Sequence, residues 1–226
     1  MWDRPDLLAL RQGEVTPYDV ADLELHEGGS SFSWEGRRVK LAVPGAHNAL
    51  NATAALHAAS LAGASAEDAI AGVEAFTGAG RRFQLLGRTA AGARVYDDYA
   101  HHPTEVEATL RAARTLPHRH LLAVFQPHLY SRTALLAPAF GRALALADAV
   151  AVLGVYPARE RAEEHPGVSG LLIAEASADA AGGRPVYWLP DFASALPVLE
   201  SAQHDGDVVV AMGAGDIDRL ARELVR

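Results

Sequence analysis

The sequence lacks cysteine altogether: none occurs among its 226 residues. This absence excludes a disulfide framework, a thiolate zinc site and a cysteine nucleophile. Long hydrophobic runs are missing as well, since no apolar stretch reaches the ~18 residues that a membrane-spanning helix needs. Met1 leads directly into Trp2-Asp3-Arg4, without the charged and apolar segments of a signal peptide. We therefore expect a soluble, cytoplasmic protein with no membrane partner.

Lysine is almost absent. Lys40 is the only lysine, and the other 19 of the 20 basic residues are arginine. A Walker-type phosphate loop requires a Gly-Lys-Ser/Thr step, whereas Lys40 follows Arg38-Val39 with no glycine-rich loop before it. The sequence therefore contains no P-loop. A net charge of −8 and an isoelectric point near 5.6 argue against nucleic acid as a partner.

Half of the residues are apolar, which is enough for one large domain or two modest ones. Apolar and polar residues alternate over 18–25 and 31–43, which predicts an antiparallel hairpin or meander. The small and apolar residues of 46–61 and 66–76 predict two helices. Residues 77–83, with two glycines, are typical of a linker.

Beyond Gly87, strand and helix signals alternate. We expect strands at 94–98, 119–125, 149–155, 185–189 and 207–212. We expect helices at 103–116, 132–147, 168–178, 191–203 and 215–225. Short strands separated by helices of this length predict an α/β fold with a mostly parallel sheet. Right-handed crossovers then place the carboxyl ends of the strands at one edge of the sheet.

Titratable side chains gather where the first of these strands ends. Asp97, Asp98, His101 and His102 lie within the stretch 96–105. Open α/β sheets place their ligand-binding groups at the carboxyl ends of strands, and unpaired buried charge is costly. The four residues therefore indicate either a functional site or a solvated polar turn.

The second strand also ends in polar residues, over 126–133. Arg132 falls in the first turn of the following helix and can offer a bidentate fork to a carboxylate or a phosphate. An arginine is locally unfavourable at the positive end of a helix dipole, which favours an anion beside it.

Two later loops follow strands at the same edge. The charged loop 156–167 is either a flap over the site or a solvated loop, and we favour the solvated loop. The last strand ends in Gly213-Ala214-Gly215. These glycines permit a close backbone approach, but the third glycine of a dinucleotide fingerprint is missing.

Two groups nearer the N-terminus have two interpretations each. His47, Asn48 and Asn51 lie at the first turn of a predicted helix, where the asparagine side chains either cap the helix or contact a ligand. Arg81 and Arg82 in the linker are either solvated or offer their charge to an anion.

Five stretches, in this order, resemble the Mur ligase family and most closely its alanine-adding members. They are GAHNALNA (45–52), GRRF (80–83), YDDYAHHPTE (96–105), FQPHLYSRT (125–133) and GAGD (213–216). The pairing of DDYAHHPTE with FQPH is specific to the alanine-adding members. The resemblance extends from about residue 18 to the C-terminus.

The resemblance implies that the chain holds parts of two domains. Residues 1–82, with the β-hairpin and its helices, would be the C-terminal part of a central ATP-binding domain, and residues 83–226 a Rossmann-like C-terminal domain. The missing N-terminal domains of the same enzyme, its partners, would carry the UDP-binding site and the P-loop. The implied activity is ATP-dependent ligation of L-alanine to UDP-N-acetylmuramate through an acyl phosphate, in peptidoglycan precursor synthesis. Mg²⁺ would be held mostly by the missing half of the central domain, so we expect this chain alone to be inactive.

The resemblance also implies a role for individual residues that would contact ATP. His47, Asn48 and Asn51 would lie by the adenine. Arg82 would reach the ATP phosphates, and Asp98 would hold the ribose hydroxyls.

The pocket for alanine and the reacting carboxyl phosphate would, on the same grounds, be lined by Tyr99, His101, His102, His128 and Arg132. Three of these, His101, His128 and Arg132, would be catalytic. The arginine would orient the alanine carboxylate and stabilise the oxyanion. Leu129 stands where many relatives carry a second arginine, which leaves Arg132 to anchor the carboxylate with less help.

Two other functions fit the residues without the resemblance. The first is a metal-dependent hydrolase, in which the ligands of a hard metal or zinc would be Asp97, Asp98, His101, His102 and His128. The second is a non-catalytic module that binds a nucleotide or a partner protein. Bound metal without nucleotide would identify the hydrolase, and weak nucleotide binding without turnover would identify the module.

Overall fold

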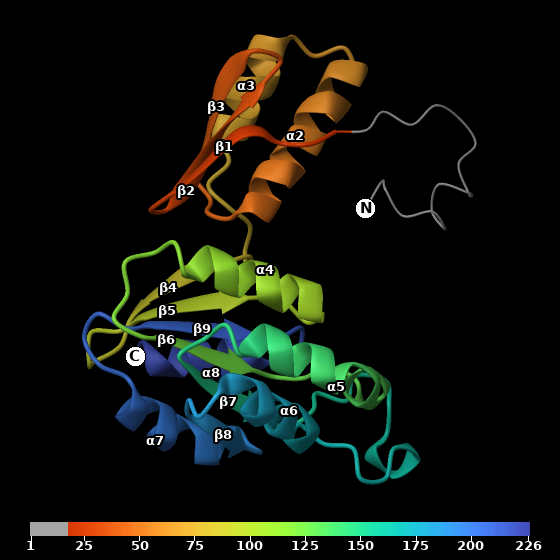
Figure 1. Cartoon of the computed structure of the whole chain (residues 1–226), viewed down its shortest axis with the longest axis vertical. Coiled ribbons are helices and arrows are strands. Elements are labelled where there is room, and N and C mark those ends of the chain that lie inside the picture. Colours follow the sequence, from red (N-terminus) through yellow and green to blue (C-terminus); the bar gives the residue numbers. More distant parts are fainter. Residues whose placement is uncertain (1–17) are drawn as a thin grey trace. The chain divides into compact units, whose positions relative to one another are not determined.

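The computed structural model describes residues 18–226, so the expected absence of a signal peptide and the start of the first predicted domain lie outside the described residues. The described chain divides into two compact units (Figure 1). Residues 18–25 and 29–76 form the first unit, and residues 77–226 together with 26–28 form the second. The predicted linker 77–83 belongs to the second unit, where Arg81 bonds to Asp97 and Tyr99.

The first unit is a three-stranded sheet with two helices. Its strands are β1 (Ala21–His26), β2 (Gly29–Trp34) and β3 (Arg37–Leu41), in the order β1-β2-β3, and its helices are α2 (Ala46–Leu61) and α3 (Ala66–Glu74). Glu35 and Gly36 join β2 to β3 with φ angles of 48° and 74°, as a two-residue hairpin turn requires. The predicted meander and both predicted helices are therefore confirmed.

The core of the first unit lies between this sheet and its helices. Phe32 and Trp34 of β2 pack with Leu56 of α2 and with the small residues Ala49 and Ala69. Small residues let a helix approach a sheet closely, and this accounts for the alanine-rich composition of α2.

The second unit contains a six-stranded sheet in the order β4-β5-β9-β6-β7-β8. Its strands are β4 (Gln84–Arg88), β5 (Arg94–Asp98), β6 (Leu121–Phe125), β7 (Ala149–Leu153), β8 (Val186–Leu189) and β9 (Val208–Met212). All neighbours pair in parallel except β4 and β5. The predicted α/β fold with a mostly parallel sheet is confirmed. The inner strands β6 and β9 are buried throughout, as their uninterrupted apolar sequences require.

The sequence did not reveal β4, the antiparallel edge strand. Its pairing with β5 is interrupted between Leu85 and Gly87 by a bulge. Gly87 has a φ angle of +155°, and a glycine inside a strand is typical of such a bulge rather than of regular alternation.

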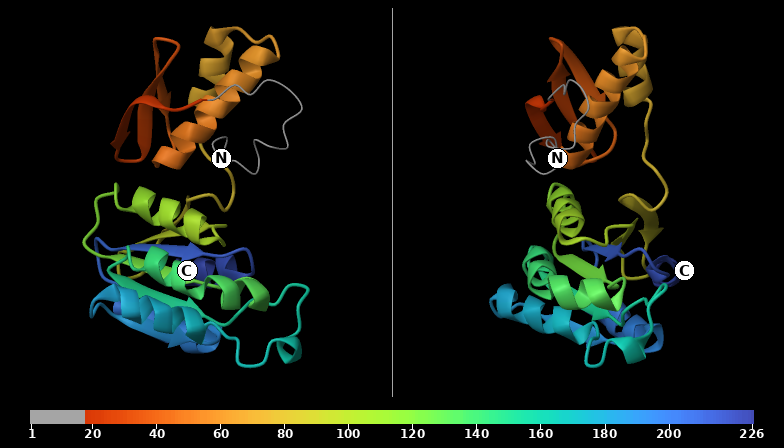
Figure 2. Two further views of the ribbon diagram at one scale, coloured as in Figure 1. Left: turned by 45° about the vertical axis from the view of Figure 1, so that its right-hand side comes forward. Right: turned by 90° about the vertical axis from the view of Figure 1, so that its right-hand side faces the viewer.

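Helices cover both faces of this sheet (Figure 2). They are α4 (Pro103–Ala113), α5 (Tyr130–Leu144), α6 (Leu171–Ala181), α7 (Phe192–Ala202) and α8 (Ile217–Leu224). Leu110 of α4, Phe140 of α5 and Ile173 of α6 pack in the core of one face. Leu199 of α7 and Leu220 of α8 pack in the core of the other. Among residues 18–226, no helix has both the length and the apolar character needed to cross a membrane.

The carboxyl edge of the sheet, where β5, β9, β6 and β7 end side by side, has diverging connections. The helices that follow β5 and β6 cover one face, whereas the helix that follows β9 covers the other. Open α/β sheets bind ligands where neighbouring connections diverge in this way. The predicted polar stretches 96–105 and 125–133 both lie at this edge.

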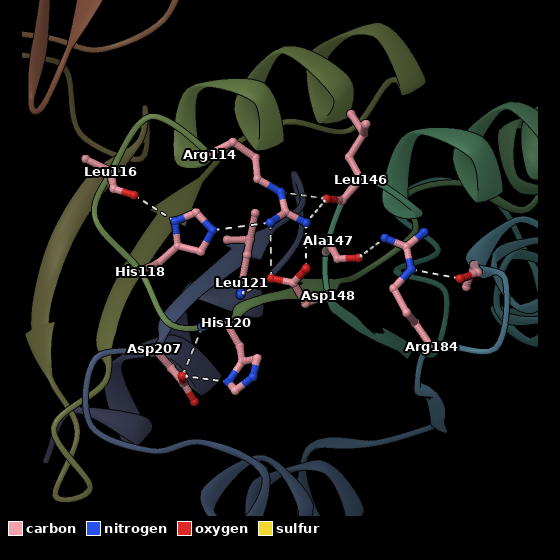
Figure 3. Close-up of polar contacts among 11 residues, drawn as sticks. Arg114, Leu116, His118, His120, Leu121, Leu146, Ala147, Asp148, Arg184 and Asp207 are labelled. Atoms are coloured by element: carbon pink, nitrogen blue, oxygen red, sulfur yellow. Dashed lines mark hydrogen bonds and ion pairs between the residues drawn. The ribbon is translucent and has the colours of Figure 1, made fainter.

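The opposite, amino edge is held by an ion-pair network (Figure 3). Arg114, at the end of α4, donates to both carboxylate oxygens of Asp148, at 2.7 and 3.2 Å, and to the Leu146 carbonyl at 2.7 Å. The same carboxylate accepts the Leu121 N–H at 2.8 Å. Partial burial opposes ionisation of Asp148, but the hydrogen bonds from Arg114 and Leu121 outweigh it and hold the pKa below its usual value. One carboxylate thus joins the starts of β6 and β7 to α4.

Histidines complete the amino edge. Asp207 accepts the backbone N–H groups of His120 and His204, at 3.2 and 2.8 Å. The Nδ1 of His118 lies 2.7 Å from the Leu116 carbonyl. Because a carbonyl only accepts, Nδ1 carries the proton, and the lone pair of the neutral ring falls on Nε2, 3.3 Å from Arg114 Nη1.

Candidate functional site

Asp98 is the last residue of β5 and is almost fully buried. One carboxylate oxygen accepts the Phe83 N–H at 2.7 Å, and the other accepts the Ala100 N–H at 2.8 Å and the Thr109 hydroxyl at 3.2 Å. Burial raises the pKa of Asp98, although these hydrogen bonds and Arg82 oppose the rise. The carboxylate therefore fastens the segment before β4 to the end of β5. A carboxylate has about four acceptor positions, and these three donors do not fill them all. The predicted contact with ribose hydroxyls stays a prediction.

Asp97 is completely buried beside it. Its Oδ2 accepts Arg81 Nε at 3.2 Å, while Oδ1 has no hydrogen-bond partner. Burial raises the pKa of Asp97, and the Arg81 guanidinium only partly offsets this effect. A buried carboxylate with one unpaired oxygen is destabilising unless another group satisfies it.

Arg81 connects the ends of two strands. Besides Asp97, its guanidinium donates to the carbonyls of Gly215 and Gly213, at 3.1 and 2.8 Å. The sequence left open whether this arginine is solvated or binds an anion, and in the structure it is bonded within the protein. Arg82 is exposed, and its guanidinium lies 5.5 Å from the centre of the Tyr99 ring. Arg82 rather than Arg81 therefore remains open to an anion.

His101 lies at the turn between β5 and α4. Its Nδ1 lies 2.9 Å from the Tyr99 carbonyl, so this nitrogen carries the proton, and the lone pair of the neutral ring is on Nε2. The backbone N–H of His101 donates to Glu105 at 2.9 Å. The ring centroids of His101 and Tyr99 are 5.4 Å apart.

His102 caps α4. Its ring Nδ1 accepts the Thr104 N–H at 3.3 Å, and its own N–H donates to Glu105 at 3.1 Å. This is a capping box in which histidine occupies the position usual for serine or threonine. The structure thus shows a local role for His102, and its predicted contact with substrate is a separate proposal.

His128 follows β6 and faces the same edge. Its ring is stacked on Tyr156, with centroids 5.7 Å apart and an interplanar angle of 14°. The centroid of the His101 ring is 5.9 Å away. Burial lowers the pKa of His128, and the positive charge of Arg132 lowers it further. The ring is therefore neutral at pH 7, and its Nδ1 is buried without a hydrogen-bond partner.

Arg132, in the first turn of α5, completes a group of three. Its Nη1 donates to the His101 carbonyl at 3.3 Å, so it links α5 to the turn after β5. His101, His128 and Arg132 come from two separate stretches of sequence and meet at the carboxyl edge. A neutral imidazole next to a guanidinium can accept a proton while the guanidinium binds an anion.

The glycines after β9 pack closely against protein groups. A Cβ at Gly213 would lie 2.8 Å from the Gln126 carbonyl, and one at Gly215 would lie 2.4 Å from Gln126 Oε1 and 2.5 Å from the Tyr156 ring. Gln126 also donates to Asp216 at 2.8 Å. This packing and the bonds from Arg81 account for both glycines without a bound nucleotide.

The proposed metal site of a hydrolase receives no support. Within residues 18–226, no group of three or more histidine, aspartate or glutamate side chains could hold a metal ion. Asp97 pairs with Arg81, Asp98 accepts three protein donors, and His102 caps a helix. The residues named as ligands are thus bonded separately rather than gathered around one point.

Comparison with known proteins identifies the family. The sequence model described as "Mur ligase, glutamate ligase domain" matches residues 81–215, more than half of the chain. The chain belongs to the Mur ligase family. The resemblance seen in the five sequence stretches is therefore confirmed.

Several similar Mur ligases carry more specific names. UDP-N-acetylmuramate–L-alanine ligase of Chlorobaculum parvum is 49% identical over 217 residues, which cover 92% of this chain and 46% of that protein. The enzyme of the same name from Mycolicibacterium smegmatis is 50% identical over 243 residues, covering 99% and 48%. The crystal structure of UDP-N-acetylmuramate–alanine ligase from Thermotoga maritima superposes with a TM-score of 0.71 at 26% identity, covering 91% and 44%. The chain spans about half the length of the curated relatives it matches.

The remaining predicted site residues of this Mur ligase chain lie in the first unit. His47, Asn48 and Asn51 share the first turns of α2. The helix is capped by the Gly45 backbone rather than by an asparagine side chain, and Asn48 Nδ2 donates to the Pro44 carbonyl at 2.8 Å. Asn51 is exposed. Their proposed contact with adenine stays a prediction.

Sequence reasoning missed Tyr156 and Glu160, both on the loop after β7. Tyr156 stacks on His128, and Glu160 accepts the Ser131 N–H at 2.9 Å. The sequence leaves a flap and a solvated loop open here and favours the solvated loop. Its place after a parallel strand was a signal that it shares the edge with His128 and Arg132.

Proposed function

We propose that this chain is the C-terminal half of an enzyme that joins L-alanine to UDP-N-acetylmuramate with cleavage of ATP, a step in peptidoglycan precursor synthesis. The observation that carries the proposal is the meeting of His101, His128 and Arg132 at the carboxyl edge of the sheet. Relatives about 50% identical that bear the corresponding name support it.

The reaction would proceed in two steps. A carboxylate oxygen of UDP-N-acetylmuramate attacks the terminal phosphorus of ATP, which forms an acyl phosphate and releases ADP. The neutral amine of alanine then attacks the acyl carbon. The new C–N bond forms, the C–O bond to phosphate breaks, and inorganic phosphate leaves with the electron pair.

The carboxyl-edge residues would act in the second step. Arg132 would bind the alanine carboxylate through charge-assisted hydrogen bonds. His128, neutral because its pKa is lowered, would accept a proton that alanine's ammonium group must lose before attack. His101 would present Nε2 towards the same pocket, with Tyr99 packed against its ring. His102, at the exposed end of the turn, would border this pocket.

ATP would be a further substrate. His47, Asn48 and Asn51 would border the adenine, Asp98 the ribose hydroxyls and the exposed Arg82 the phosphates. Mg²⁺ would be held mainly by the parts of the enzyme that this chain does not contain.

We propose the corresponding domain assignment as well. Residues 1–82 would be the last part of the central ATP-binding domain, and residues 83–226 the C-terminal domain. Because the sequence contains no P-loop, this chain alone would release no phosphate from ATP. It would need the preceding domains of the same enzyme.

The test is an assay of the complete reading frame that contains this sequence beside the 226-residue chain. With UDP-N-acetylmuramate, ATP and Mg²⁺, we expect the complete protein to release phosphate only when L-alanine is added. The 226-residue chain should release none. A folded complete protein without alanine-dependent release would refute the ligase function, and release by the short chain would refute its dependence on the preceding domains.

A further inference from the structure

The loop after β7 contacts each of the four residues 128–131 around the start of α5, by hydrogen bonds or by ring stacking. This loop runs over 154–170 and includes the short 3-10 helix η1 (Ala162–Glu164). The Tyr156 N–H donates to the Pro127 carbonyl at 2.8 Å, and the Leu129 N–H donates to the Tyr156 carbonyl at 3.0 Å. The two bonds flank His128 along the chain, and the Tyr156 ring covers the imidazole.

Leu129 shows that this segment is constrained. It is buried and has a φ angle of +71°. A bulky side chain rarely occupies positive φ, and such a conformation persists only where the surroundings determine it. The bond from Leu129 to the Tyr156 carbonyl supplies that constraint, because it fixes the backbone at the entry to α5.

Glu160 binds the first turn of α5 from the same loop. Its carboxylate accepts both the N–H and the hydroxyl of Ser131, the residue before Arg132. A helix N-terminus has unpaired N–H groups and a positive dipole end, so a carboxylate is favoured there. The hydrogen bonds from Ser131 lower the pKa of Glu160 because they favour the ionised carboxylate.

His165 adds a third contact. Its ring is stacked on Tyr130 at 5.7 Å, with an interplanar angle of 19°, and its Nε2 lies 3.7 Å from Glu160 Oε2. Residues 128, 129, 130 and 131 therefore each contact Tyr156, Glu160 or His165. No side chain of this loop needs to touch a substrate to have this effect.

We propose that Glu160, supported by Tyr156 and His165, is a positioning residue that holds the start of α5 so that His128 and Arg132 face the carboxylate and amine of an amino-acid substrate. This inference rests on the proposed function for the identity of the substrate. The positioning itself is a property of the chain and can be measured without turnover.

The first experiment uses the 226-residue chain. Glu160→Ala is compared with Glu163→Ala, an exposed glutamate on the same loop, by NMR titration of His128 and amide exchange of Ser131. The charged or titratable groups that act on His128 are Arg132, His101, Arg159 and Glu160. Loss of the Glu160 charge alone would lower the pKa of His128 further. Release of the loop would instead expose the ring and raise its pKa towards the ordinary value.

We expect the pKa of His128 to rise in Glu160→Ala, with Ser131 exchange faster by about tenfold or more, and no change in Glu163→Ala. A fall in the pKa, or equal behaviour of the two variants, would overturn the proposal. This result does not depend on ligase activity.

The second experiment uses the complete enzyme. Since positioning acts on substrate binding, Glu160→Ala should raise KM for alanine about tenfold and change kcat less. Glu160→Gln keeps an acceptor for Ser131 and should recover part of the loss. An unchanged KM in Glu160→Ala would overturn the proposal, whereas a wild-type enzyme inactive with alanine would refute only the proposed function.

Discussion

Aspartates at the two edges of the mostly parallel sheet differ in their hydrogen bonding and in the direction of their pKa shifts. At the amino edge, both carboxylate oxygens of Asp148 have donors, and its pKa is lowered. At the carboxyl edge, Asp97 has an oxygen without a partner, and burial raises its pKa. Among residues 18–226, the two titratable side chains that have a buried polar atom without a hydrogen-bond partner are Asp97 and His128, and both lie at the carboxyl edge.

This difference separates a structural role from a functional one. Residues that serve folding are expected to satisfy each other's hydrogen bonds, because an unsatisfied buried group lowers stability. Residues that serve a ligand keep hydrogen-bonding capacity that the protein itself does not use. The amino-edge network of Arg114 and Asp148 fits the first description, and His128 with its unpaired Nδ1 fits the second.

The largest effect is expected at the carboxyl edge from Arg132→Ala in the complete enzyme. A hydrogen bond to a charged group contributes ~1.5–3 kcal/mol, and Arg132 can offer two to the alanine carboxylate. The kcat/KM for alanine should therefore fall about a hundredfold or more. Stability should change little, because the arginine's hydrogen bond within the described part of the chain is a single one, to the His101 carbonyl.

The matched control is Arg142→Ala, an exposed arginine in the last turn of the same helix. Its kcat/KM should equal that of the wild type in the alanine-dependent phosphate assay. If the two variants lose activity equally, the loss comes from the changed net charge or from impaired folding. Arg132 would then have no specific role in binding alanine.

The sequence predicted the fold well because buried parallel strands are continuous apolar runs, as in Val208–Met212. It failed at β4, where a bulge and Gly87 break the pattern. It also predicted that the polar stretches 96–105 and 125–133 lie at one edge of the sheet, since right-handed crossovers bring the carboxyl ends of parallel strands to the same edge.

The bonding partners within the site could not be predicted. Arg81 and Arg82 are adjacent and identical in type, yet Arg81 bonds to Gly215, 134 residues later in the chain, while Arg82 is exposed. His102 caps α4, a local role that its residue type did not indicate. Contacts of this range depend on side-chain geometry in the folded protein, which residue type and spacing do not determine.

A smaller effect is expected at the amino edge. Asp148→Asn replaces an ionised acceptor that Arg114 and the Leu121 N–H both use, so it should lower the free energy of unfolding by about 1–3 kcal/mol. The pKa of Asp148 is lower in the folded state, so its stabilisation is present above the unfolded pKa and is lost as pH falls through the folded value. Urea unfolding of the 226-residue chain at pH 7 and at pH 3 measures this. The difference in free energy of unfolding between wild type and Asp148→Asn should be smaller at pH 3 than at pH 7. An equal difference at both pH values would contradict a stabilising role for the ionised carboxylate.

The smallest effect on the free energy of unfolding should come from Asp97→Asn. This variant should be slightly more stable than the wild type or equally stable. The pKa of Asp97 is raised in the folded state, so the ionised form destabilises the fold at neutral pH, and protonation at lower pH relieves this. Asparagine can still accept from Arg81 Nε while placing a neutral group at the unpaired position. The free energy of unfolding at pH 7 should therefore stay within ~1 kcal/mol of wild type or rise. A loss as large as that of Asp148→Asn would mean that the Arg81 ion pair outweighs burial, so that both edges are held by satisfied charges and the contrast between them disappears.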